Sequence, residues 1–441
     1  MDVATLDQLL GPTGRAALAA ARELQPTETK YPACFDRLRK HFSPELARAA
    51  LDTVMLREKA RAKFARADEM VFTREALEMA SAEPVARYRA ERFAPFGTVA
   101  DLCCGIGGDA IGLASAGVSV VAVDRDPLRV RMAEANLAAY GLIQNPIEPT
   151  SGSLPPWGGG LGWGGGLPGM SQYQLPDDTL TPHPNPPPLG GRGPSPGGRF
   201  VCADVLTVDL ADCVAAFADP GRRPGGRRTL SPHDSEPPVP DLVARFPRDF
   251  PLGVKVAPGF PKDELADFDA GPEFVSLHGE LKECVLWFGP FKTGVRATVL
   301  PGPHTLTGYP DAAVDLGSVG AFLYDPDPAV TRAGLVGELG RRLSARQIDP
   351  RIAFLTSDAL TATPFASVYR VEEVLPFHAR RVGEWLKAQG VGRVTVVKRG
   401  SAVEADELAA RWKLRGDGHR AVILTRAVGG PVAIIGERVE A

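Results

Sequence analysis

Residues 97–110 read GTVADLCCGIGGDA, a short apolar run that leads directly into a glycine-rich turn. A short helical pattern then ends at Gly117, the β-branched run VSVVAVD follows at 118–124, and a second helical pattern extends from Pro127 to Gly141. The order strand, helix, strand and helix predicts parallel strands joined by right-handed crossovers. This stretch therefore predicts an α/β domain built around a mostly parallel sheet.

Three more strand patterns continue this domain further along the chain. They are RFVCADV at 199–205, CVAAFADP at 213–220 and PLGVKVAP at 251–258. We expect the next two apolar runs, FVSLHGELKECVLWFG at 274–289 and RATVLP at 296–301, to pair antiparallel because they are close in sequence. Parallel strands followed by such a pair are typical of a Rossmann-like, doubly wound sheet with an antiparallel edge hairpin.

The chain of 441 residues is too long for one ordinary core, and its patterns divide it into regions. Apolar residues recur at helical spacing through 1–95, and the α/β domain occupies 96–300. Within that domain, 145–199 is so rich in Pro and Gly that we expect a disordered insertion. A connecting α/β region is expected at 301–368, and a compact α+β unit at 369–441.

Composition sets limits on function without choosing one. The net charge of −3 neither demands nor excludes a nucleic-acid partner. None of the six cysteines forms a C-x-x-C pair or a cluster with histidines, so we expect no metal. The N-terminus lacks the pattern of a signal peptide, and no apolar run approaches the ~20 residues that cross a bilayer. We therefore expect a cytoplasmic protein with no membrane partner.

The glycine turn predicts a ligand site at the carboxyl end of the sheet, where doubly wound folds bind their ligands. Gly105 and Gly107 lack a Cβ and allow the backbone to approach a ligand closely. Asp101 ends the first strand, where its carboxylate can hold an ammonium group directly or through water. Asp109 stands where the next helix begins, so we expect it to cap that helix first of all. Cys103, inside the turn, is assigned to the same site.

Acidic residues also end the second and third strands. Asp124 can accept hydrogen bonds from both hydroxyls of a ribose, and we place the adjacent Arg125 beside it. Asp204 can accept from an adenine amino group, and Val205 would form part of the wall around the base. These groups suit S-adenosylmethionine, which is zwitterionic at one end and aromatic at the other.

A nicotinamide cofactor is the alternative, because GIGGDA also satisfies the G-x-G-x-x-A pattern and Asp124 would serve that cofactor equally well. Three features favour S-adenosylmethionine. An acid at Asp101 precedes the glycines, Asp204 repeats the acid at the end of the third strand, and Asp219-Pro220 closes the fourth.

Several motifs together resemble bacterial class I methyltransferases that carry a C-terminal THUMP-like domain. They are DLCCGIGGD at 101–109, VDRDP at 123–127, ADPGRR at 218–223, GELKECVLWFGP at 279–290, YDPDPAVTRAGLVGELG at 324–340, EVLPFHARRV at 373–382 and VGRVTVVKRG at 391–400. The resemblance covers nearly the whole chain except the Pro/Gly-rich insertion. It implies methyl transfer from S-adenosylmethionine, a THUMP-like unit at 369–441 and an RNA substrate such as tRNA or rRNA.

In this family the acceptor meets the methyl group beside the loop after the fourth strand, which here contains Asp219, Pro220 and Arg222. Amino-methylating relatives have Asn/Asp-Pro-Pro-aromatic in this loop, whereas arginines replace the aromatic residue here. Arg222 is assigned to the catalytic loop with Asp219 and Pro220, and Arg223 is assigned to phosphate binding. A solvated basic loop is the alternative for these arginines. Cys284 is the one downstream candidate for a cysteine nucleophile, and its apolar surroundings favour a buried structural role instead.

The partner predicted for the C-terminal unit is RNA. Lys398 and Arg399 follow an apolar strand, so we expect them at its mouth, where they could bind phosphates. Trp412 lies between basic residues, but we expect it in the core of the unit. Two alternatives remain: a small-molecule or protein methyltransferase, and a non-catalytic RNA-binding module.

Overall fold

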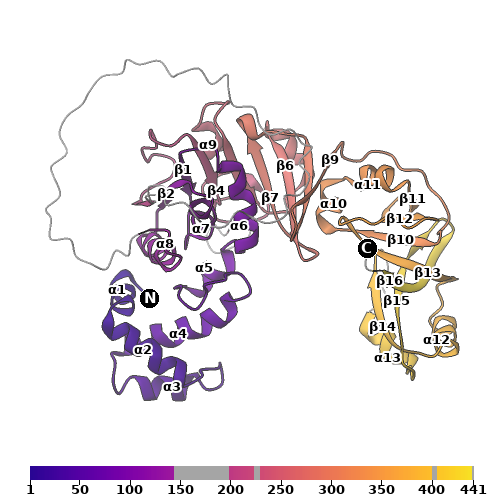
Figure 1. Cartoon of the computed structure of the whole chain (residues 1–441), viewed down its shortest axis with the longest axis horizontal. Coiled ribbons are helices and arrows are strands. Elements are labelled where there is room, and N and C mark those ends of the chain that lie inside the picture. The colour runs from indigo at the N-terminus through magenta and orange to yellow at the C-terminus, as the bar shows by residue number, and fades with distance from the viewer. Residues whose placement is uncertain (144–197, 223–228, 400–404, 440–441) are drawn as a thin grey trace.

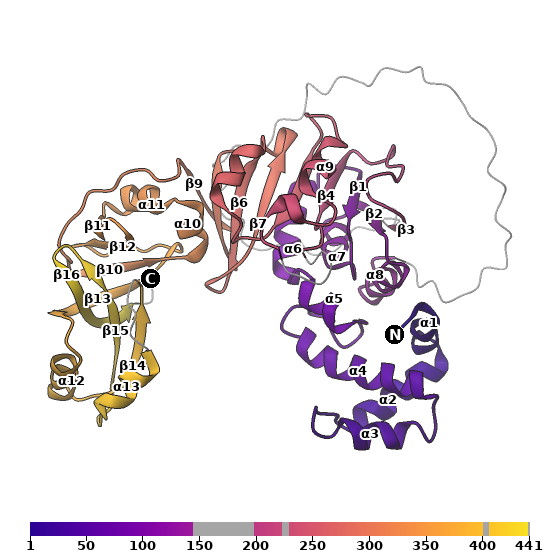
Figure 2. The same cartoon turned by 180° about the vertical axis from the view of Figure 1, so that it is seen from behind.

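Two β-sheets and an N-terminal group of helices make up the computed structural model, which describes residues 1–143, 198–222, 229–399 and 405–439 (Figure 1). The nine-stranded sheet lies between the N-terminal helices and the seven-stranded sheet, and the view from behind shows the same order (Figure 2). Most of the Pro/Gly-rich insertion expected at 145–199 lies outside the described residues. No helix in the described ranges has the length and apolar character needed to cross a membrane.

The nine-stranded sheet has the strand order β3-β2-β1-β4-β5-β7-β6-β8-β9. Its first five strands, up to β5, are parallel, and β7 joins them antiparallel, which confirms the doubly wound α/β fold. The strands are β1 (Thr98–Leu102), β2 (Ser119–Asp124), β3 (Gly198–Cys202), β4 (Ala215–Ala218), β5 (Leu252–Val256), β6 (Gly271–Leu277), β7 (Glu280–Phe288), β8 (Val295–Leu300) and β9 (His304–Gly308). The helices between them are α7 (Gly108–Ser115), α8 (Pro127–Ala139) and α9 (Val239–Ala244).

The antiparallel hairpin differs from the one expected. The run at 274–289 is not one strand that pairs with 296–301; it contains parts of β6 and all of β7, which pair with each other. His278 and Gly279 turn the chain between them with φ of 52° and 76°, the left-handed values that two-residue hairpin turns need. Strand β8 pairs parallel with β6, and β9 adds a further strand, so the hairpin lies inside the sheet.

The N-terminal region is helical, as expected. Its helices are α1 (Val3–Leu10), α2 (Pro12–Glu23), α3 (Tyr31–Leu38), α4 (Pro44–Ala60), α5 (Arg74–Met79) and α6 (Glu83–Ala90). Helix α4 starts at a Ser-Pro pair, because the Ser43 hydroxyl accepts a hydrogen bond from the Leu46 N–H at 3.3 Å and Pro44 occupies the first turn.

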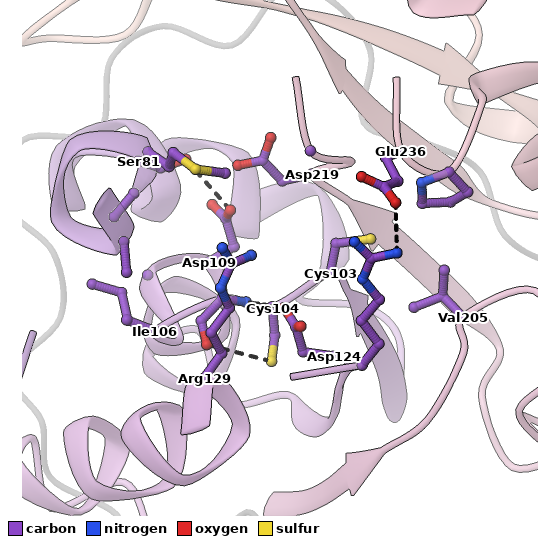
Figure 3. Close-up of a pocket in the computed structure, with 18 of the residues that line it drawn as sticks. Ser81, Cys103, Cys104, Ile106, Asp109, Asp124, Arg129, Val205, Asp219 and Glu236 are labelled. Carbon is purple, nitrogen blue, oxygen red and sulfur yellow. Dashed lines mark hydrogen bonds and ion pairs between the residues drawn. The ribbon is translucent and has the colours of Figure 1, made fainter. Parts of the chain in front are cut away.

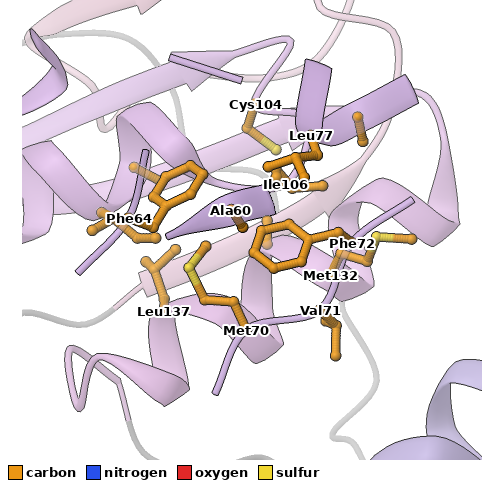
Figure 4. Close-up of a cluster of buried hydrophobic side chains, with 14 of the residues drawn as sticks. Ala60, Phe64, Met70, Val71, Phe72, Leu77, Cys104, Ile106, Met132 and Leu137 are labelled. Atoms are coloured by element: carbon orange, nitrogen blue, oxygen red, sulfur yellow. The ribbon is translucent and has the colours of Figure 1, made fainter. Parts of the chain in front are cut away.

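A buried apolar cluster joins these helices to the α/β domain (Figure 4). The rings of Phe64 and Phe72 lie 6.0 Å apart, next to Ile106 from the glycine turn and Met132 and Leu137 from α8. Because Ile106 packs against these side chains, the apolar cluster supports the glycine turn. The segment that ends in α5 is thereby held next to the ligand site.

The seven-stranded sheet has the order β11-β12-β10-β13-β16-β15-β14. Its strands are β10 (Phe322–Pro326), β11 (Arg346–Asp349), β12 (Ile352–Ser357), β13 (Ala366–Pro376), β14 (Val391–Lys398), β15 (Gly418–Ala427) and β16 (Gly430–Val439), and its helices are α10 (Pro328–Ala333), α11 (Val336–Leu343), α12 (Ala379–Ala388) and α13 (Ala405–Trp412). From β13 onward the order is strand, helix, strand, helix and hairpin, which is the α+β unit expected at the C-terminal end of the sequence. Strands from the connecting region, 301–368, belong to the same sheet. Trp412 is buried and donates a hydrogen bond to the Ala379 carbonyl at 2.8 Å, as a core residue should.

Helix α10 links the two sheets. It packs against β6 and β8, and its Arg332 donates to the carbonyls of Pro258, at 2.6 Å, and Phe260. The apolar residues of α10 and α11 share one buried cluster with those of β4 and β5. The C-terminal sheet is therefore connected to the α/β domain by a common core.

Candidate active site

A cavity of about 410 Å³ opens at the carboxyl ends of the parallel strands (Figure 3). This volume lies in the range of sites for small ligands and cofactors. The lining residues come from the strand ends of the α/β domain and from the helical region: Glu75, Ala76, Met79, Ala80, Ser81, Cys103, Cys104, Gly105, Ile106, Gly108, Asp109, Asp124, Arg125, Arg129, Ala203, Asp204, Val205, Leu206, Asp219, Gly221, Glu236 and Pro237. Of the residues assigned to cofactor binding, Asp101 and Gly107 are outside this lining.

The two predicted glycines have different structural roles. Gly105 has φ of 55°, and a Cβ added there would meet no protein atom within 4 Å, so its missing side chain leaves room beside the cavity. Gly107 has φ of 82°, and a Cβ there would come within 2.9 Å of Leu137 and 3.1 Å of Ala133 on α8. Gly105 therefore leaves space for a ligand, whereas Gly107 allows the turn to pack on a helix.

Asp124 is held in place by the backbone. Its Oδ2 accepts from the Gly105 N–H at 3.0 Å, and its Oδ1 accepts from the Asp126 N–H at 3.0 Å. Each carboxylate oxygen can accept a second hydrogen bond. The geometry suits a ligand with two neighbouring hydroxyl groups, such as a ribose.

Asp101 lies below the cavity with no exposed surface. Neither of its carboxylate oxygens has a hydrogen-bond partner among the described residues. Burial raises the pKa of this carboxyl well above its usual range, and the nearby charges of Asp109 and Asp219 raise it further. A cationic group bound beside this carboxyl, such as the ammonium of S-adenosylmethionine, would favour its ionised form.

A chain of polar contacts links β4, β5 and α7 to the end of α5 in the wall of the cavity. The Lys255 ammonium donates to Asp219 Oδ2 at 2.6 Å and to the Ser81 hydroxyl at 3.0 Å. Ser81 in turn donates to Asp109 at 3.4 Å (Figure 3). One buried hydroxyl therefore connects the carboxylates of Asp109 and Asp219.

Arg89 of α6 also belongs to this chain of polar contacts. Its guanidinium pairs with both Asp109 and Glu283, donates to Ser81 at 3.1 Å and lies 4.5 Å from the centre of the Phe217 ring. Burial alone would lower the pKa of Arg89, but the two carboxylates outweigh burial and raise it. For Glu283 burial is the largest effect and raises its pKa, although Arg89 opposes this. The role expected first for Asp109, capping α7, was wrong, because its carboxylate faces Arg89 and Ser81 and Gly107 occupies the cap position.

The remaining predicted residues are placed as follows. Asp204 is exposed, with its Oδ1 bound to the Leu206 N–H at 2.9 Å, and Val205 is buried beside it. Arg125 forms an ion pair with Glu236 at 2.6 Å, and both residues line the cavity. Asp219 lines the cavity, whereas Pro220 and Arg222 are outside its lining. Arg223 lies outside the described residues.

The C-terminal cations are far from this cavity along the chain. Lys398 is exposed at the end of β14. Arg399 is engaged within the protein: its guanidinium pairs with Asp325 at 2.7 Å and donates to the Pro326 carbonyl at 2.9 Å. Cys284 is fully buried, in agreement with the structural role expected for it.

Three contributors to the site were missed in the sequence. Ser81 ends FTREALEMAS at 72–81, within the helical region 1–95, to which no site residue was assigned from the sequence. Lys255 left a signal, as a charged residue inside the apolar run PLGVKVAP. For Arg89 the sequence contained no signal, because its partners are 20 and 194 residues away.

Comparisons with known proteins match this organisation. Residues 366–438 match a family model described as THUMP domain-like, residues 96–160 match one described as RNA cap guanine-N2 methyltransferase, and residues 2–60 match a domain of unknown function. A protein described as an uncharacterized S-adenosylmethionine-dependent methyltransferase in two strains of Mycobacterium tuberculosis is 31% identical over 394 residues, which cover 87% of this chain and 94% of that protein. The crystal structure of a putative methyltransferase from Porphyromonas gingivalis W83 has the same fold, with a TM-score of 0.69 and 19% identity, and the match covers 97% of this chain and 99% of that one.

Proposed function

The chain belongs to the family of S-adenosylmethionine-dependent methyltransferases, and we propose that it transfers the methyl group to RNA. The RNA proposal rests on two matches to RNA-related family models within one protein. The match to an RNA cap guanine-N2 methyltransferase model covers the glycine turn, and the match to a THUMP domain-like model covers β13 to β16. In better-understood enzymes, THUMP domains present RNA, chiefly tRNA, to a methyltransferase or other modifying domain.

Different residues in and below the cavity would bind different parts of the cofactor. Asp124 would bind the ribose hydroxyls, Gly105 would leave room for the amino-acid part, and the uncompensated carboxyl of Asp101 would face the ammonium group. Asp204 and Val205 would border the adenine, and Cys103 and Arg125 complete the lining. When bound, S-adenosylmethionine supplies a methyl group that is activated as part of a sulfonium cation.

The acceptor would lie beside Asp219. One carboxylate oxygen of Asp219 accepts a hydrogen bond from Lys255, and Asp219 also lines the cavity. Direct methyl transfer mainly requires that the acceptor be positioned in line and that water be excluded. Asp219 is suited to orient the acceptor, and Arg222, in the same loop, to contact the RNA backbone.

Mass spectrometry of the nucleosides in RNA tests this proposal. RNA from a strain that lacks the gene should lose one methylated nucleoside, which the wild-type gene restores and Asp219→Asn does not. An Asp219→Ala protein should retain nearly full affinity for S-adenosylhomocysteine in calorimetry, because its contact is with the acceptor.

An unchanged set of methylated nucleosides in the deletion strain would contradict the RNA proposal. A methylated metabolite or protein that disappears in the same strain would then identify the alternative acceptor. An equal loss of S-adenosylhomocysteine affinity in Asp219→Ala would instead place Asp219 in the cofactor site.

A further inference from the structure

We propose that Lys255 is a positioning residue for methyl transfer: its ammonium holds one oxygen of the Asp219 carboxylate, so that the second oxygen faces the acceptor. The inference rests on the proposed role of Asp219 at the acceptor, but not on the chemical class of the acceptor. Nothing in the glycine motif or in the cofactor-binding carboxylates requires a lysine at this place.

The geometry around Lys255 is specific. The residue lies in the middle of the sheet, on β5, with 5% of its surface exposed. Its Nζ is 2.6 Å from Asp219 Oδ2 and 3.0 Å from Ser81 Oγ, whereas Asp219 itself is 20% exposed on its side chain and lines the cavity. A buried ammonium group is costly unless it is paired, so its presence here needs a reason. The pair leaves Oδ1 of Asp219 available to the cavity.

The charges around Asp219 explain why a cation is needed. The acids Asp101 on β1 and Asp109 on α7 lie in the same wall, with Cys103 at the cavity and Glu283 on β7 behind Lys255. The cations that face this group are Arg89 on α6 and Lys63 before α5. Arg89 is already shared between Asp109 and Glu283.

Lys63 is also engaged elsewhere. Its ammonium donates to the carbonyls of Leu77 and Ala80, both at 2.8 Å, and burial followed by the charges of Lys255 and Lys282 lowers its pKa to about 8. Lys255 is thus the cation in direct contact with Asp219 among the described residues. Without it, the Asp219 carboxylate would face the neighbouring acids with no cation in direct contact.

This arrangement suits an acceptor that carries a proton on its attacking atom, an N–H or an O–H group. The acceptor atom forms a bond to the methyl carbon while the carbon–sulfur bond breaks and leaves its electron pair on sulfur, and the proton of the acceptor passes to Oδ1 of Asp219. Lys255 keeps its own proton throughout. Ser81 fixes the ammonium from the other side, so that the lysine cannot turn away from Asp219.

The test uses the full-length protein and labelled S-adenosylmethionine, with an extract of a strain that lacks the gene as the source of acceptor. Lys255→Met should lower kcat at pH 7 by about 100-fold, within the range for general-base catalysis. The acid limb of its pH–rate profile should move to higher pH, because an unpaired buried carboxylate takes up a proton more readily. Lys255→Arg keeps the charge and should return the acid limb close to its wild-type position.

Two further measurements separate positioning from a general structural role. The affinity for S-adenosylhomocysteine should stay within about twofold in both Lys255 variants, as calorimetry measures. The variant Lys292→Met is the matched control, because Lys292 pairs with Asp269 on the surface and its loss should leave rate and pH profile unchanged. If Lys255→Met does not fold, Lys255→Gln, which removes the charge but keeps a hydrogen-bond donor for Asp219 and Ser81, takes its place in the comparison with Lys255→Arg.

The possible results distinguish the two proposals. Ribonuclease treatment of the extract abolishes labelling only if the acceptor is RNA, whereas the Lys255 variants act on the rate for any acceptor. A pH–rate profile of unchanged shape in Lys255→Met, or an Arg variant as impaired as the Met variant at every pH, overturns the role proposed for Lys255.

Discussion

The ion pairs of the two sheets differ in how deeply their side chains are buried. In the nine-stranded sheet and the helix that packs on it, Arg89 pairs with Asp109 and Glu283 while only 2% of its side chain is exposed. In the seven-stranded sheet and its helices the exposed fractions of the side chains are larger, 26% and 18% for Arg399–Asp325 and 82% and 60% for Arg380–Glu384. A buried charge must be compensated by a partner, whereas an exposed one is stabilised by water.

This difference has a consequence for function. Around the cavity, Asp109 and Asp219 belong both to the proposed site and to the buried ion pairs, so substitutions there should affect function and stability together. On the C-terminal unit, exposed charges can change with little effect on stability. Such a surface can therefore adapt to a charged partner.

The largest expected effect is on the buried ion pairs. Arg89→Met leaves Asp109 and Glu283 without their cation, and we expect the free energy of unfolding to fall by about 3–5 kcal/mol. Arg380→Met is the control from the other unit and should cost less than about 1 kcal/mol, because its pair with Glu384 is exposed. Urea denaturation of both variants measures the two changes in the free energy of unfolding, and equal losses of stability would contradict the prediction.

A second prediction concerns acid. Burial raises the pKa of Glu273, but Arg92 and Arg296, with hydrogen bonds from Thr298 and Tyr88, outweigh burial and lower it to about 2. Because the folded pKa lies below the ordinary value of 4.5, this group stabilises the fold above pH 4.5, and the contribution disappears as the pH falls toward 2. The shift corresponds to about 3 kcal/mol.

Denaturation curves measured between pH 5 and about pH 2 test this. Glu273→Gln should lose less stability over that range than the wild type, by about the amount above. Asp358→Asn provides the comparison from the C-terminal unit: its partner Arg346 lowers the pKa of Asp358, but the carboxyl is fully exposed, so the variant should follow the wild-type curve. A Glu273→Gln curve parallel to the wild type would contradict the prediction.

The third effect is on cofactor affinity. Asp124→Ala removes a charge-assisted pair of contacts with the ribose, so binding of S-adenosylhomocysteine should weaken by about 1.5–3 kcal/mol. Gly105→Val should be at least as damaging, since its side chain would enter the space beside the cavity at a positive φ. Asp209→Ala is the control, because that carboxylate binds only the Ala211 N–H in an exposed turn. Calorimetry that finds wild-type affinity in both cavity variants would refute the assignment of the site.

The smallest effect is expected on the C-terminal unit. If Lys398 contacts a phosphate, Lys398→Gln should reduce the slope of log K against log salt by about 0.7–0.9 without changing S-adenosylhomocysteine binding. Arg399→Gln should change this slope less, because Arg399 is paired with Asp325. Fluorescence titrations with tRNA at several salt concentrations measure both, and a wild-type protein that does not bind RNA at low salt would contradict the RNA proposal.

The sequence by itself determined the local pattern of this protein. Short-range periodicity was enough to predict the doubly wound sheet. The acids at the strand ends, Asp101 and Asp204, together with Asp219-Pro220, favoured S-adenosylmethionine over a nicotinamide cofactor. The strands and helices after residue 369 were predictable for the same reason. Each of these features depends on neighbours that are close in sequence.

Only the tertiary structure decided which distant side chains meet. Ser81 and Lys255 are 174 residues apart in the chain, and Arg89 and Glu283 are 194 apart, yet each pair is in contact. The parallel pairing of β8 with β6 and the internal ion pair of Arg399 are long-range contacts of the same kind. Periodicity reports which face of an element is buried, but packing decides which charges share that buried space and therefore how they are compensated.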